Sequence, residues 1–84
     1  MKYCFITFRS VTFAQRGEHE LQRMGIHCNI QRTPRWMEEQ GCGYSIRLRC
    51  QDVTVAVELL KRKQIAYRKV YLHGDNGELE ETAL

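Results

Sequence analysis

The chain has 84 residues, enough for one domain with a two-layer core but too few for an enclosed active-site cavity of ordinary enzyme size. Its hydrophobic content of 43% is typical of a folded globular protein, and no apolar run is long enough to cross a bilayer. The net charge of +3 is uneven, because residues 1–72 hold all 13 Lys and Arg, whereas residues 73–84 hold four acidic residues and no Lys or Arg. A basic body favours polyanions or acidic protein surfaces as partners, or is simply a solvated surface that uses arginine.

The start of the chain and its cysteines indicate the cellular compartment. Residues 1–9 place charge beside a very short apolar run that continues into a strand pattern, so we expect no signal peptide. The four cysteines include no Cys-x-x-Cys pair, and the three histidines complete no zinc-ligand spacing. We therefore expect reduced thiols, a cytoplasmic location, no metal site, no cofactor and no membrane partner.

The first predicted elements are a strand and a helix. Residues 2–8 are apolar on both faces, which is typical of a central strand. Ser10 or Thr12 can cap the helix, and Gln15 would complete a capping box with Thr12. Gly17 on the apolar face indicates a close approach of helix and sheet. The predicted buried face of the helix is Ala14, Gly17, Leu21 and Met24.

Two further strands are predicted from alternating apolar residues. Gly25 stands where a helix ends, and Ile26 is the apolar residue that packs back onto the last turn. The second strand would turn inward Ile26, Cys28 and Ile30. The third strand, after an eleven-residue connection, would turn inward Tyr44, Ile46, Leu48 and Cys50.

The last part of the chain predicts a second helix, a fourth strand and a tail. Asp52 is the expected helix cap, and the apolar stripe is Val53, Ala56, Leu59 and Leu60. Ile65 repeats the role of Ile26, and residues 66–72 alternate as a strand. Residues 73–84 combine turn formers with acidic residues, so we expect a disordered acidic tail.

The element order βαββαβ predicts the fold class. Right-handed crossovers place both helices on one face of a four-stranded antiparallel sheet, which is the ferredoxin-like α+β sandwich. Residues 1–72 form this single domain. In this topology the connection between the second and third strands is a hairpin, and eleven residues exceed the usual two to five, which indicates a functional loop.

The candidate functional site is this loop. Cys42 stands between Gly41 and Gly43, whose freedom can present its sulfur to a large partner. Arg32 and Arg35 are cations that favour the thiolate, the reactive form of cysteine. Thr33 and Pro34 fit the cap and first turn of a short helix, whose free amides would form an anion-binding corner with Arg35. The alternative is an exposed cysteine in a glycine turn with no role.

The other cysteines and the loop tryptophan have structural interpretations. Cys4, Cys28 and Cys50 lie at inward strand positions, where burial explains them. Whether Cys42 pairs with Cys28 or Cys50 under oxidation is left open. Trp36 is either an anchor for a partner or the lid of the core beneath the loop.

The open face of the predicted sheet mixes aromatic and basic side chains: Tyr3, Phe5, Tyr71, Arg47, Arg49 and Lys69. Such a face can stack bases, but the Gly-flanked aromatic run of the RNA-recognition signature is missing from residues 44–50. Sheet-to-sheet contact in a homodimer explains the aromatic residues as well. We rank a homodimer above nucleic-acid binding.

The chain resembles the selenium/sulfur carrier-like family through Leu72. The resemblance is carried in order by the Tyr-x-x-x-x-Phe-x-Ser segment over residues 3–10, then Ala14, Leu21, Gly25-Ile26, Thr33-Pro34-Arg35, Cys42-Gly43 and Arg47. It implies a carrier, rather than a stand-alone enzyme, whose Cys42 accepts sulfur or selenium and passes it to an acceptor enzyme. Residues 36–41 depart from the family pattern, which has a serine-rich stretch there.

The leading hypothesis is therefore a sulfur or selenium carrier that holds a persulfide or selenosulfide on Cys42. Its partners would be a cysteine desulfurase, or another persulfide or selenium donor, and an acceptor enzyme. The alternative is a small regulatory or protein-interaction module that uses the open sheet face or Trp36, with no thiol chemistry.

Overall fold

The computed structural model describes residues 3–32, 43–73 and 79–82. In chain order its elements are β1 (Tyr3–Phe8), α1 (Val11–Arg23), β2 (Cys28–Arg32), β3 (Tyr44–Arg49), the 3-10 helix η1 (Cys50–Asp52), α2 (Val53–Arg62), β4 (Val70–His73) and β5 (Leu79–Thr82). Neither of the described α-helices is long and apolar enough to span a membrane.

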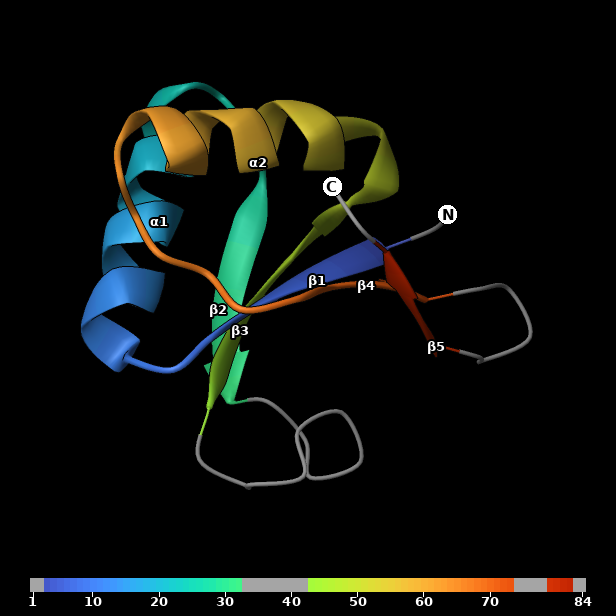
Figure 1. The fold of residues 1–84 in the computed structure, drawn as a ribbon. Helices are drawn as coiled ribbons and strands as arrows, with labels where there is room; N and C mark the ends of the chain where they lie inside the picture. The colour runs from blue at the N-terminus through green and yellow to red at the C-terminus, as the bar shows by residue number, and fades with distance from the viewer. Residues whose placement is uncertain (1–2, 33–42, 74–78, 83–84) are drawn as a thin grey trace.

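The strands form one antiparallel sheet in the order β2-β3-β1-β4-β5. Both helices lie on one face of it, as Figure 1 shows. The first four strands thus have the predicted ferredoxin-like arrangement, with β1 in the centre between β3 and β4. The even-numbered residues of β1, Cys4, Ile6 and Phe8, are all buried in the core under the helices.

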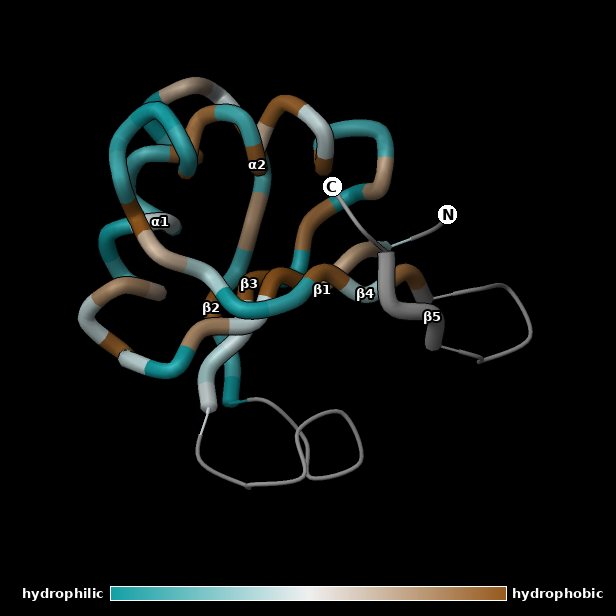
Figure 2. The backbone as a smooth tube through the Cα atoms, viewed as in Figure 1, coloured by the Kyte–Doolittle hydropathy of each residue, from teal (hydrophilic) through white to brown (hydrophobic). Residues whose placement is uncertain are grey.

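The helices bury the faces that the spacing predicts, with two differences. Ala14, Gly17 and Leu21 of α1 are buried, but Met24 is the C-cap and is 62% exposed, because the helix has ended there and the chain turns away. In α2 the buried set also includes Val57. Figure 2 shows hydrophobic residues along β1 at the centre of the sheet and hydrophilic residues before β4.

The helix caps follow the sequence in α1 and depart from it in α2. Ser10 is the N-cap of α1, and its Oγ accepts a hydrogen bond from the Thr12 N–H at 3.1 Å. Asp52 precedes α2 but makes no capping hydrogen bond, since its carboxylate pairs with Arg49, three residues earlier, at 3.5 Å. In η1, Asp52 therefore forms an ion pair instead of the predicted helix cap.

Both helices end in the same way. Gly25 has a φ of 82°, and the Ile26 N–H donates to the Leu21 carbonyl at 3.0 Å. Gln64 has a φ of 58°, and the Ile65 N–H donates to the Leu60 carbonyl at 2.9 Å. Each is a left-handed residue followed by an apolar residue that bonds back across the last turn. The correspondence of Ile26 and Ile65 in the two halves is therefore confirmed.

Gly17 confirms the predicted close approach of α1. A methyl group built on it would meet Ile46 Cδ1 of β3 and Leu60 Cδ2 of α2 at 3.2 Å and Phe8 Cζ of β1 at 3.3 Å. Glycine therefore stands where one helix contacts the sheet and the other helix at once. Its low helix propensity is the cost of that packing.

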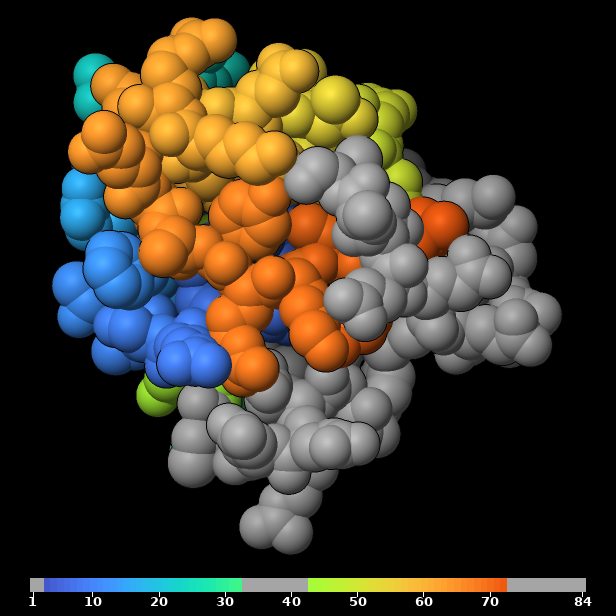
Figure 3. Space-filling view, viewed as in Figure 1, coloured from blue at the N-terminus to red at the C-terminus, as the bar shows by residue number. Residues whose placement is uncertain are grey.

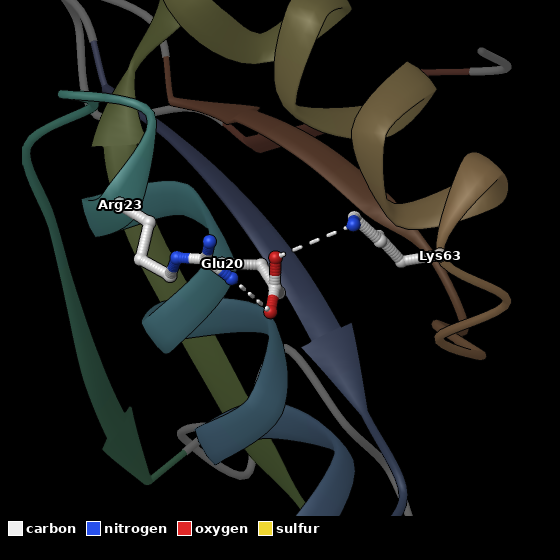
Figure 4. Close-up of polar contacts among 3 residues, drawn as sticks. All are labelled: Glu20, Arg23 and Lys63. Atoms are coloured by element: carbon white, nitrogen blue, oxygen red, sulfur yellow. Dashed lines mark hydrogen bonds and ion pairs between the residues drawn. The ribbon is translucent and has the colours of Figure 1, made fainter.

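An ion-pair cluster joins the C-terminal ends of the two helices at the surface. Figure 4 shows Glu20 of α1 between Arg23, at 3.4 Å, and Lys63, which follows α2, at 4.0 Å. Exposed pairs of this kind contribute about 0–1 kcal/mol, so apolar packing between the helices dominates.

The fourth strand is shorter at its start than predicted. Both the Arg68 N–H and the Lys69 carbonyl bond to the backbone of Thr7, at 2.7 Å and 2.8 Å, so two residues oppose one, as in a β-bulge. The regular ladder therefore begins at Val70, opposite Ile6. Figure 3 shows this segment before β4 at the surface, between α2 and the start of α1.

The disordered tail was predicted wrongly for residues 79–82. They form β5, which pairs along β4 with Tyr71 opposite Glu81 and Leu72 opposite Glu80. The unpaired backbone of the β4 edge is a template for a further strand, and the charged residues that argue for disorder are also typical of an edge strand. The other residues of the tail lie outside the described ranges.

Candidate functional site

The predicted site lies on the connection between β2 and β3. The two strands pair directly, with Arg32 opposite Tyr44, so the connection leaves and re-enters the sheet at one cross-strand pair, as a hairpin does. Arg32 is exposed at the end of β2, and Gly43 is buried just before β3. The remaining predicted residues lie outside the described ranges, namely Thr33, Pro34, Arg35, Gly41 and Cys42.

The N-terminus of α1 lies at the same end of the sheet. Phe8, the last residue of β1, pairs with Tyr44, and α1 begins three residues later at Val11 (Figure 1). The first turn of α1 holds no acidic residue, and its free amides give this end a partial positive charge. Arg9, between β1 and α1, is exposed like Arg32. The described surroundings of the hairpin are therefore mainly basic, and an acidic group beside them, Glu18, accepts a hydrogen bond from the Ile30 N–H at 2.8 Å.

Two of the described cysteines are poor nucleophiles. Cys4 and Cys28 are only 3% and 5% exposed. Burial raises the pKa of the Cys28 thiol from 9.0 to about 11, helped by the negative charge of Glu18. Burial also raises the pKa of Cys4, followed by its hydrogen bond and charge interaction with Cys50. Both side chains are therefore neutral thiols near pH 7, as the structural interpretation of these cysteines predicts.

Cys50 differs from its prediction. It lies in η1 rather than in a strand, and it is half-buried against the edge of the core. Its Sγ is 2.6 Å from the Sγ of Cys4. Sequence analysis missed this contact, although strand register contains the signal: Cys4 pairs with Leu48, so Cys50 follows on the same face, two residues further.

The open face carries the predicted aromatic and basic residues. The Arg47 guanidinium lies 4.9 Å from the centre of the Tyr3 ring, within the range of a cation–π interaction. A shallow pocket of about 260 Å³ beside them is lined by Tyr3, His27, Asn29, Arg47, Leu48 and Arg49. This pocket lies at the far end of β3 from the hairpin, so the structure does not bring it together with Arg32 and Gly43.

Metal-binding side chains do not gather in the described ranges. Across residues 3–32, 43–73 and 79–82 there is no group of three or more His, Cys, Asp or Glu residues that could hold an ion.

Comparison with known proteins identifies one family. The model of the family described as "Putative Se/S carrier protein-like" matches residues 3–72, which include β1 through β4 and the whole β2–β3 connection. No curated protein and no solved structure matches the chain. On the strength of this match over most of its length, the chain belongs to the Se/S carrier protein-like family.

Proposed function

We propose that the protein carries sulfur or selenium as a persulfide or selenosulfide on Cys42 and delivers it to an acceptor enzyme. The observation that carries the proposal is the family match, which spans the β2–β3 connection and its cysteine. The proposal includes a cytoplasmic location, where thiols stay reduced, and requires no cofactor.

The described cysteines support Cys42 as the carrier residue. Cys4 and Cys28 are buried and remain protonated, so neither can attack a donor that is itself a protein. Cys50 is half-buried and contacts Cys4. A carrier has to meet two partner enzymes in turn, so its cysteine has to be reachable by a large surface. Cys42, between two glycines in a long connection, fits that requirement.

The charges around the hairpin support the reactive form of this cysteine. A thiolate and a terminal persulfide are both anions, and Arg9, Arg32 and the N-terminus of α1 provide positive potential at this end of the sheet. Within the proposal, Arg35 is the nearby cation that favours the Cys42 thiolate, and Thr33 and Pro34 shape the loop. Gly41 gives the sulfur access in this proposal, whereas Gly43, which was expected to do the same, is buried just before β3.

The transfer is a thiol exchange. The Cys42 thiolate attacks the outer sulfur of a cysteine persulfide on the donor, which a cysteine desulfurase can provide. A new S–S bond forms to Cys42 while the S–S bond of the donor breaks, and the donor leaves as a thiolate. No electrons are gained or lost overall, because the sulfane sulfur only changes its carrier. The same exchange applies with selenium as the transferred atom.

The test is the intact mass of the protein after incubation with a cysteine desulfurase and cysteine. Wild type and Cys28→Ser should each gain the mass of one sulfur atom, and Cys42→Ser should gain none. Cys28→Ser is the matched control because it also removes one thiol, but a buried one. Arg32→Ala should slow the loading severalfold, because it removes a cation at the base of the hairpin.

The outcomes separate the proposal from its alternative. Sulfur added equally to Cys42→Ser and wild type would refute Cys42 as the carrier, and no addition to any variant would refute carriage from this donor. In the alternative, the chain is an interaction module whose open face binds an acidic partner or a second copy. The Arg47–Tyr3 contact beside the pocket favours that use of the face. Then Arg47→Ala would abolish partner binding while Cys42→Ser would leave it intact.

A further inference from the structure

Cys4 and Cys50 form a thiol pair away from the hairpin. Cys4 is the second residue of β1, and Cys50 is the first residue after β3. Their sulfur atoms are 2.6 Å apart. A disulfide has an S–S length of about 2.05 Å, so the two atoms need to approach by only about half an ångström to form the bond. The third described cysteine, Cys28, instead donates its Sγ–H to the Glu18 carbonyl at 3.8 Å.

The two thiols differ in access. Cys4 lies under the helices and is 3% exposed, whereas Cys50 is half-buried at the edge of the core. An oxidant in solution therefore reaches Cys50 first. Burial is the largest cause of the raised pKa of Cys4, and its hydrogen bond and charge interaction with Cys50 add to it. Modification of the outer thiol removes these two smaller contributions, and the short distance between the sulfur atoms brings Cys4 into position to attack.

We propose that Cys4 and Cys50 are a reversible dithiol–disulfide pair, oxidised by low-molecular-weight disulfides such as oxidised glutathione. The Cys50 thiolate attacks one sulfur of the small disulfide, which forms a mixed disulfide and releases one thiolate. Cys4 then loses its proton and attacks Cys50 Sγ, which forms the Cys4–Cys50 bond and releases the second thiolate. The two cysteines lose two electrons together, and the small disulfide gains them as two thiols.

This modification site does not use Cys42 and stands independently of the proposed carrier activity. The disulfide would tie the start of β1 to the junction between β3 and α2, across 46 residues of chain. It closes a long loop in the unfolded state, so oxidation should raise the stability of the folded domain. Disulfides of reducing compartments are mostly transient and redox-sensing, and this pair has the partial exposure that such a role requires.

The experiment maps disulfides in the full chain after equilibration with oxidised and reduced glutathione. Trypsin places the four cysteines in four different peptides, residues 3–9, 24–32, 36–47 and 50–61. After free thiols are alkylated and the protein is digested, mass spectrometry identifies each linkage unambiguously. We expect the linked pair of peptides 3–9 and 50–61 in wild type, Cys28→Ser and Cys42→Ser. Dithiothreitol should reverse it.

The Cys50→Ser variant and the disulfide linkages found in wild type each test whether Cys4 and Cys50 pair. Cys50→Ser should lose the linkage and leave Cys4 unmodified at glutathione ratios that oxidise wild type. A link from Cys50 to Cys42 or Cys28 instead would overturn the proposal. A stable glutathione adduct on Cys50 without any Cys4 link would also overturn it, and both results are read from wild type even if Cys50→Ser folds poorly. Loss of sulfur loading in Cys42→Ser, with this linkage retained, separates the two proposals.

Discussion

Replacement of Gly17 by alanine tests the packing at the centre of the fold. Helix propensity alone favours alanine by about 1 kcal/mol. The added methyl group, however, would lie 3.2–3.3 Å from Phe8, Ile46 and Leu60, which are all 0% exposed and belong to three different elements. None of these side chains can move into solvent, and overpacking of a filled core costs about 1–3 kcal/mol. We expect Gly17→Ala to lower the free energy of unfolding by about 1 kcal/mol.

The assay is urea unfolding followed by far-UV circular dichroism. Gln15, exposed in the same helix, provides the control, because the difference between Gln15→Ala and Gln15→Gly measures helix propensity without the packing. Ile46→Val removes the contacting Cδ1 atom and alone costs about 0.5–1.5 kcal/mol. In the double variant with Gly17→Ala, the loss should be smaller than the sum by about 0.5–1 kcal/mol. Stabilisation by Gly17→Ala, or strict additivity with Ile46→Val, would refute the reasoning.

Three further predictions concern a helix end, a buried hydroxyl and the buried thiols. Gln64→Gly should raise the free energy of unfolding by about 0.5–1 kcal/mol in urea, because a left-handed φ of 58° disfavours residues other than glycine. Thr7→Val should lower it by about 1 kcal/mol and speed amide exchange at Lys69, whose N–H donates to Thr7 Oγ1 at 3.0 Å. The pKa values of Cys4 and Cys28 are raised to about 12 and about 11, so the stability that these thiols contribute is complete below pH 9.0 and falls as the pH rises through these values, because the unfolded chain loses the protons first. Urea unfolding in reductant across this pH range should show that the free energy of unfolding falls less steeply for Cys28→Ala than for wild type. An equally steep fall would contradict the raised pKa of Cys28.

The fold was predictable because several kinds of local signal agree. Alternation in β1 and β3, helical spacing in α1 and the paired signals at Ile26 and Ile65 all indicate the same two-layer arrangement. These signals depend on residues that are close in the sequence and on which positions are apolar, and both can be read from one sequence. The strand order then follows from the handedness of the two crossovers.

The errors occur where a distant part of the chain competes with a local signal. Asp52 has the residue type of a helix cap, but its carboxylate forms an ion pair with Arg49, three residues earlier. Residues 79–82 look like a solvated tail, but β4 offers an unpaired edge to which they add as a strand. The sequence predicts an ordinary strand residue at Thr7. Only the folded chain shows that its hydroxyl bonds to the backbone of Lys69, in the bulge before β4.

The hairpin connection and Cys50 lie at opposite ends of β3. The hairpin connection enters β3 at Tyr44, and Cys50 follows the last residue of β3, Arg49. Five residue steps in a strand span about 17 Å, so the Cys4–Cys50 pair lies far from the described base of the hairpin at Arg32 and Tyr44. Both β3 and β1 connect the pair to that end of the sheet, since Ile46 and Leu48 are buried in the core and Phe8 pairs with Tyr44. Loading rates of Cys42 measured with the Cys4–Cys50 pair oxidised and reduced would determine whether the domain couples its two thiol sites or only contains them.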